Sequence, residues 1–161
     1  MIGSNIIRAG LLLATLTLPG SATQAANSPF FPMAGSWSGG GVLNTTDGTQ
    51  ERLRCRASYG VGAAGYQLRL NLRCASDSYN FDLASDVQYR GGAVSGSWNE
   101  ASRNVSGTLS GRATGDHIDV LARGQGFSAE LSLTTHGRRQ TISIHPEGTD
   151  IREVSLALDR H

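Results

Sequence analysis

The sequence predicts an all-β domain, an antiparallel up-and-down meander closed into a small barrel of about 8–10 strands with one disulfide. Three observations support this class. Apolar and polar residues alternate with period two in one segment after another, as in half-buried strands. Turn residues such as Asp47-Gly48 and Gly91-Gly92 recur between these segments, and no proline occurs between Met33 and His145. A two-sheet sandwich is the alternative arrangement.

The clearest hairpin lies between residues 51 and 76. From Leu53 to Tyr59 every second residue is apolar or cysteine, and the same holds from Tyr66 to Cys74 after a glycine-rich turn. Folding the segment about this turn places Cys55 opposite Cys74, both on the apolar face. The sequence therefore predicts a disulfide between these two cysteines, which requires an oxidising compartment.

The remaining strands follow in order along the chain. A first strand is expected around Trp37, and alternation then extends from Tyr79 to Tyr89. Strands are also expected around Trp98 and Leu109, and shorter alternating patterns follow at residues 118–122, 127–133, 142–144 and 154–158. Glycines inside strands mark bends or close backbone approach, which barrel closure needs; they are Gly39, Gly41, Gly96, Gly107 and Gly111. The pattern indicates about ten strands and no amphipathic helix.

The N-terminal part of the chain divides into a leader and an arm. Residues 1–25 combine Arg8, an apolar run over 9–18 and small residues before Ala25, which predicts a cleaved secretory signal peptide. The apolar run is too short for a membrane-spanning helix. Residues 26–34 form a proline-containing arm, expected to plug or cross one barrel end, and residues 35–161 form the domain.

Charge and composition limit the possible partners. Without Arg8, the chain has 13 arginines against 13 acidic residues, so its formal net charge is zero. This balance gives no electrostatic case for nucleic acid, and membrane association is not expected. The four histidines are scattered and no Cys/His cluster occurs, so no metal site or cofactor is predicted. No catalytic grouping is recognisable, so the sequence predicts a protein that is not an enzyme.

Gly35-Ser36-Trp37, at the start of the first strand, resembles the Gly-x-Trp motif of the calycins, the lipocalin and avidin group. The wider string of segments, GSWSGGG, ERLRCRASY, LRCAS and VSGSWNE, is similar to a family of uncharacterised exported bacterial β-barrel proteins. In lipocalins an arginine of the last strand packs over the early tryptophan. The resemblance therefore implies that Arg152 or Arg160 covers Trp37.

Two groups of residues are candidates for binding sites. Four aromatic side chains could line an apolar ligand cavity, with Glu100 as a polar contact; they are Trp37, Tyr66, Phe81 and Trp98. The alternatives are an interior filled by side chains and a Glu100 that is a surface charge. On the opposite face of the hairpin, Arg54, Arg56 and Arg73 are anion-binding candidates. The alternative is a solvated outer face with Glu51, Asp77 and Asp82 as partners.

The leading functional hypothesis is an exported module, periplasmic or secreted, that binds a small apolar or amphipathic ligand. The alternative is a protein-interaction module such as an inhibitor of a secreted protease, which would use a free N-terminal arm. An outer-membrane barrel is a third and less favoured interpretation.

Overall fold

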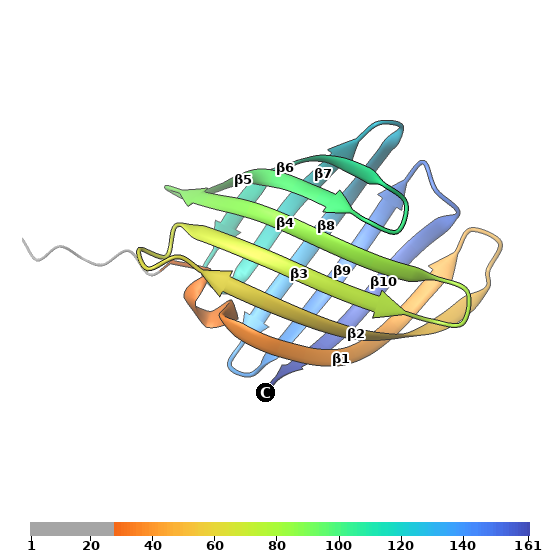
Figure 1. Cartoon of the computed structure of the whole chain (residues 1–161), viewed down its shortest axis with the longest axis horizontal. Helices are drawn as coiled ribbons and strands as arrows, with labels where there is room; N and C mark the ends of the chain where they lie inside the picture. The colour runs from red at the N-terminus through yellow and green to blue at the C-terminus, as the bar shows by residue number, and fades with distance from the viewer. Residues whose placement is uncertain (1–27) are drawn as a thin grey trace, which may run out of the picture.

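The computed structural model describes residues 28–161 as ten antiparallel strands in a closed barrel. Each strand pairs with its neighbours in the chain, and the first pairs with the last, which confirms the predicted meander and excludes the sandwich (Figure 1). The strands are β1 (Gly35–Thr45), β2 (Gln50–Val61), β3 (Gln67–Ala75), β4 (Asn80–Arg90), β5 (Ala93–Glu100), β6 (Val105–Thr114), β7 (His117–Gly124), β8 (Phe127–His136), β9 (Arg139–Glu147) and β10 (Ile151–Arg160). The predicted leader lies outside the described residues.

The hairpin of β2 and β3 has the predicted register. Cys55 pairs with Cys74, their Cα atoms are 4.1 Å apart, and the two form a disulfide. Both cysteines are buried on the inner face, while the arginines between them in sequence point outward. The alternation rule therefore sufficed here, because one face of a barrel strand is always enclosed and a slip by one residue would expose every apolar side chain.

Inward-facing glycines let the strands bend and approach one another. A Cβ added to Gly107 would lie 1.8 Å from the carbonyl oxygen of Arg123 on β7, and one added to Gly39 would lie 2.1 Å from that of Ala157 on β10. Gly41, Gly96 and Gly111 are equally tight against their neighbouring strands. The predicted role of these glycines in barrel closure is confirmed.

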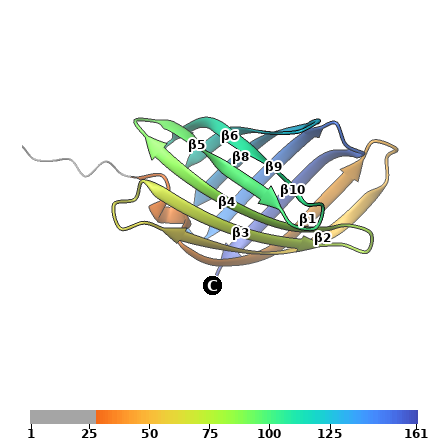
Figure 2. The ribbon, with the colours of Figure 1, turned by 45° about the horizontal axis from the view of Figure 1, so that its top comes forward.

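The N-terminal arm closes one end of the barrel. The short 3-10 helix η1 (Phe31–Met33) lies there, beside the point where the chain enters the described region (Figures 1 and 2). Phe30 and Met33 are at most 1% exposed, and the hydroxyl of Ser28 donates to the carbonyl of Gly65 in the β2–β3 turn. The arm is thus a plug, as one prediction had it. Residues 28–34 are not the free segment that the protease-inhibitor alternative needs.

The arm and the last strand meet around Trp37. The indole Nε1 donates to the carbonyl of Met33 at 2.7 Å, and the guanidinium of Arg160 covers the ring with its Cζ 4.9 Å from the centroid. Arg160 also donates to the carbonyl oxygens of Pro32 and Gly137. Of the two arginines that the calycin resemblance offered, Arg160 has this position. In residues 28–161, no helix has the length and apolar character needed to cross a bilayer.

Candidate ligand-binding site

The barrel encloses an apolar cavity of about 450 Å³. It extends from Phe30 and Met33 of the arm to the turns at the opposite end, where Arg103 and Thr149 border it. Its wall is made mainly of aliphatic side chains from β2 through β10, among them Leu70, Leu83, Leu109, Val120, Leu131, Leu133 and Ile144. The interior is therefore not filled by side chains, which decides between the two interpretations that the sequence left open.

Small residues on the inner face leave this space. Ala122 and Ala129 line the wall of the barrel, and Gly126 and Gly148 border the cavity at its turns. Ten strands also make a wider barrel than eight, and an eight-stranded barrel is just filled by its own side chains or holds one small ligand. Close-packed interiors contain few voids larger than a water molecule, so a space of this size is a built feature of the fold.

The floor of the cavity has a hydrogen-bonded polar group. Tyr59 donates its hydroxyl to Gln140 Oε1 at 2.6 Å, and Gln140 Nε2 donates to Thr135 Oγ1 at 3.0 Å. All three residues are buried. Burial raises the pKa of Tyr59 well above its ordinary value, although the bond with Gln140 acts in the opposite direction, so this hydroxyl stays protonated. Since these polar groups bond to one another, the floor offers a ligand mainly apolar contact.

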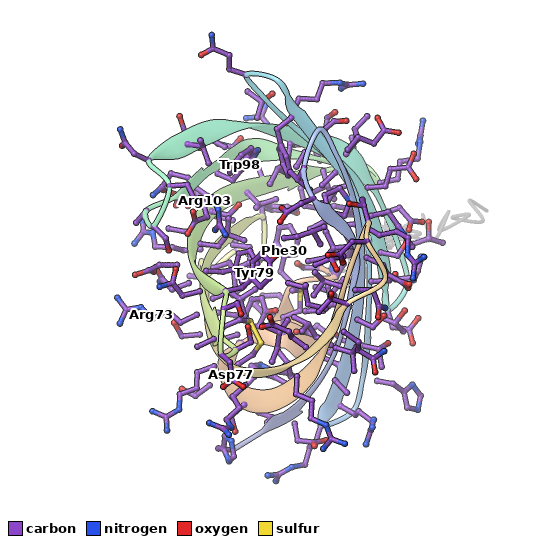
Figure 3. All side chains as sticks on the ribbon, turned by 90° about the vertical axis from the view of Figure 1, so that its right-hand side faces the viewer. Phe30, Arg73, Asp77, Tyr79, Trp98 and Arg103 are labelled. Carbon is purple, nitrogen blue, oxygen red and sulfur yellow. A yellow bond between two sulfur atoms is a disulfide. The ribbon has the colours of Figure 1, made fainter. Side chains whose placement is uncertain are left out.

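The mouth of the cavity lies at the opposite end and carries aromatic and charged side chains (Figure 3). Phe81 stacks on Tyr79 with ring centroids 6.4 Å apart, and the guanidinium of Arg103 lies 4.9 Å from the Phe81 centroid. The hydroxyl of Tyr79 donates to Asp150 at 2.8 Å, which links the β3–β4 turn to the β9–β10 turn. The contacts among Arg103, Phe81, Tyr79 and Asp150 therefore connect three turns at this end of the barrel.

Glu100 is a buried carboxylate at this mouth. It accepts hydrogen bonds from the main-chain N–H groups of Asp82, Ser102 and Arg103 at 2.8, 3.0 and 2.9 Å. Burial acts to raise the pKa of Glu100, but these hydrogen bonds outweigh it and hold the pKa below its ordinary value. Glu100 therefore fixes the β5–β6 turn. It does border the cavity, and it is not the surface charge of the alternative interpretation.

Three of the five predicted ligand residues line the cavity: Phe81, Trp98 and Glu100. Trp98 donates its Nε1 to Thr108 O at 3.1 Å and packs edge-on against Phe127. The prediction was wrong for the other two residues. Trp37 is 1% exposed and lies beneath Tyr59, which borders the cavity in its place. Tyr66 is 49% exposed, because β3 begins only at Gln67 and the alternation runs past the barrel end.

The anion-binding candidates lie on the outer wall. Arg56 and Arg73 do face each other across the β2–β3 ladder. Arg73 is paired with Asp82 at 3.2 Å, and neither it nor Arg54 borders the cavity. For Arg73 the alternative interpretation therefore applies, an arginine on a solvated outer face with Asp82 as its partner. Glu51, another predicted partner, instead accepts hydrogen bonds from Ser76 and Ser78.

Sequence reasoning missed several residues of the site. Arg103 lies in the β5–β6 turn, where no alternation shows which way a side chain points. Tyr79 and Phe127 begin alternating segments and have the inward parity, but they were not among the predicted site residues. The available signal was alternation for Tyr79 and Phe127, and for Arg103 only its closeness in sequence to Glu100. Within residues 28–161, no group of three or more His, Cys, Asp or Glu side chains is arranged to hold a metal ion.

Two solved structures resemble this barrel. The crystal structure of Rv2717c from M. tuberculosis has a TM-score of 0.63 and 14% identity, and the match covers 81% of this chain and 93% of that one. The S-type phycobiliprotein lyase CPES from Guillardia theta has a TM-score of 0.59 and 10% identity, with 82% and 90% covered. No family model matches the chain, and a comparison with curated protein sequences finds no relative. These likenesses agree with the closed-barrel fold, while the resemblance to the calycins and membership of an exported bacterial family stay predictions.

The second neighbour corrects one sequence-based expectation. The lack of a recognisable catalytic motif predicts a protein that is not an enzyme, yet a barrel of the same fold belongs to a protein named as a lyase. That expectation is contradicted. A short catalytic motif need not be present where the function resides in a site shaped by the fold. At 10% identity the likeness itself shows the fold alone.

Proposed function

We propose that this protein is an exported binding protein that holds a small apolar or amphipathic molecule inside its barrel. The observation that supports this is the apolar cavity of about 450 Å³, plugged at one end by the arm. Its volume is within the range of about 300–1,000 Å³ that ligand pockets have. Such a cavity could also hold a molecule while it reacts, but the function proposed here is binding.

The arrangement of polar and apolar surface supports this function over the alternatives. A membrane barrel has an apolar outer band and a polar lumen. Here the inner face is apolar and the outward positions of β2 and β3 carry arginine, serine and asparagine. An inhibitor that works through its arm would need residues 28–34 outside the barrel. In this structure Phe30 and Met33 are buried, and their burial holds the arm inside.

Export is the second part of the proposal. It rests on the leader-like residues 1–25 and on a Cys55–Cys74 disulfide, which persists in oxidising compartments. Mass spectrometry of the protein from fractionated cells tests it. We expect a mature chain that begins at Ala26, found in the periplasm or the medium. Full-length protein in the cytosolic fraction would contradict export without affecting the binding proposal.

Binding is tested with a matched pair of tryptophan substitutions on β6. Leu109 lines the cavity, while its neighbour Ser110 points outward. Solvent extraction and mass spectrometry of protein purified from its native compartment should recover a co-purifying molecule. Leu109→Trp should abolish this recovery by filling the cavity, whereas Ser110→Trp should leave it intact. Equal recovery from both variants, or an empty wild-type protein that binds no apolar probe, would contradict the proposal.

A further inference from the structure

Charge is confined to one part of the cavity. Among the described residues that line it, Glu100 and Arg103 are the two with ionisable charged side chains, and both lie at the mouth. The polar groups at the other end, Tyr59 and Gln140, are bonded to each other. An amphipathic ligand therefore has its polar end at the mouth and its apolar part in the barrel, because burying the polar end among aliphatic side chains would leave it unpaired.

Glu100 has little left to offer a ligand. One carboxylate oxygen accepts from the N–H groups of Asp82 and Ser102. The other accepts from the N–H of Arg103 and, at 3.5 Å, from its guanidinium. A carboxylate has about four lone-pair sites. All of them are engaged, so a ligand that brings hydrogen-bond donors would have to displace the contacts that order the β5–β6 turn.

Arg103 is in the opposite situation. Its Nη1 donates to the carbonyl of Asn80 at 3.1 Å and to Glu100, and its guanidinium lies over the Phe81 ring. Within residues 28–161, no protein atom accepts from Nε or Nη2, and the side chain is 44% exposed. A guanidinium fixed on one edge and with N–H groups left on the other is preorganised to bind a carboxylate or similar anion.

Apart from Glu100, no acidic residue among residues 28–161 lines the cavity. Asp47 accepts the N–H of Thr49 at 2.9 Å within its own turn, and Asp150 accepts the hydroxyl of Tyr79. Neither carboxylate lines the cavity. Arg103 is therefore the charged side chain bordering the cavity that keeps N–H groups available for a head group.

We propose that the ligand class is an amphipathic anion, whose apolar part fills the barrel and whose acidic head group accepts hydrogen bonds from Arg103. This inference rests on the proposed binding function and adds the chemistry of the ligand to it. Arg103 is then the residue that determines specificity, and the aliphatic wall supplies affinity without regard to the head group.

Three probes with the same ten-carbon chain test the inference: decanoate, decanol and decylammonium. Their dissociation constants are measured for the wild-type protein by titration calorimetry at one ionic strength. We expect decanoate to bind about tenfold or more tighter than decanol, since a hydrogen bond to a charged group is worth that much, and decylammonium to bind weakest. Arg103→Gln should remove the preference for decanoate and leave decanol affinity nearly unchanged.

Arg54→Gln is the matched control, since it removes an arginine from the outer wall and should not alter any of the three affinities. Decanoate binding no tighter than decanol in the wild-type protein would overturn the inference while leaving the binding function intact. Loss of decanoate preference in the Arg54 variant would also overturn it. If none of the probes binds, the proposed function itself fails. The wild-type comparison stands even if Arg103→Gln does not fold.

Discussion

Arg160 covers Trp37 and joins the two ends of the described chain. Its guanidinium lies 4.9 Å from the indole centroid and donates to the carbonyls of Pro32 and Gly137. One side chain of the last strand thus holds the first strand, the arm and the β8–β9 turn together. Since the arm closes the cavity floor, this contact also defines one boundary of the binding site.

Removing this contact should destabilise the barrel. Arg160→Ala loses a cation–π contact and leaves two carbonyl groups without their donor, so we expect the free energy of unfolding to fall by about 1–2 kcal/mol. Urea denaturation followed by tryptophan fluorescence measures it. Arg152→Ala, at the other end of β10, should change stability by less than about 0.5 kcal/mol. Equal losses in the two variants would contradict a special role for Arg160.

The disulfide should make a separate contribution. Cys55 and Cys74 are 19 residues apart, and closing a loop of that size stabilises a protein by about 3 kcal/mol in the chain-entropy model. Cys55→Ser with Cys74→Ser should lower the free energy of unfolding by roughly this amount, measured in urea. Unreduced wild-type protein should show no titratable thiol. An unchanged denaturation midpoint after reduction would show that the bridge does not act in this way.

The inward glycines allow a sharp test of strand packing. Gly107→Ala places a Cβ 1.8 Å from a main-chain oxygen of β7, so the strands must separate. We expect a loss of about 1–3 kcal/mol, as for overpacked cores. Gly60→Ala on the outward face of β2 is the control, because its Cβ would meet nothing closer than 4.0 Å. A Gly107 variant as stable as the Gly60 variant would refute tight closure at β6–β7.

Glu100 should link stability to pH. Its pKa is lowered in the folded protein, so as the pH falls the unfolded chain binds the proton first, near its unperturbed pKa of about 4.3. The stabilisation is complete above this pH and is lost as the pH falls through the folded-state pKa. Glu100→Gln should therefore be less stable than wild type at pH 7, with a difference that shrinks toward pH 3.

The control for this titration is Glu130→Gln on the outer wall of β8, which should track wild type across the range. Denaturation curves at several pH values provide the comparison. A difference between the Glu100 variant and wild type that stays constant from pH 7 to pH 3 would show that the carboxylate charge is not what stabilises the β5–β6 turn.

The barrel was predictable because its signals are local. Alternation along each strand predicts which side chains face inward. It placed Cys55 opposite Cys74. It also placed Phe81 and Trp98 on the inner face and the hairpin arginines on the outer face. It failed where strands end. Tyr66 has the correct parity but lies in a turn, and Trp37 has the correct parity but is covered by the arm and Tyr59.

The sequence by itself determined the strands, the register of the β2–β3 hairpin and the disulfide, because a period-two pattern in a closed sheet permits one assignment of inside and outside. The existence of the cavity was decided only by the tertiary structure. Whether inward residues meet across a barrel depends on its width, on the close approach of glycine-bearing strands and on how the arm fills one end. The position of Arg103 beside Glu100 and Phe81 was likewise fixed by a turn, whose direction no pattern encodes.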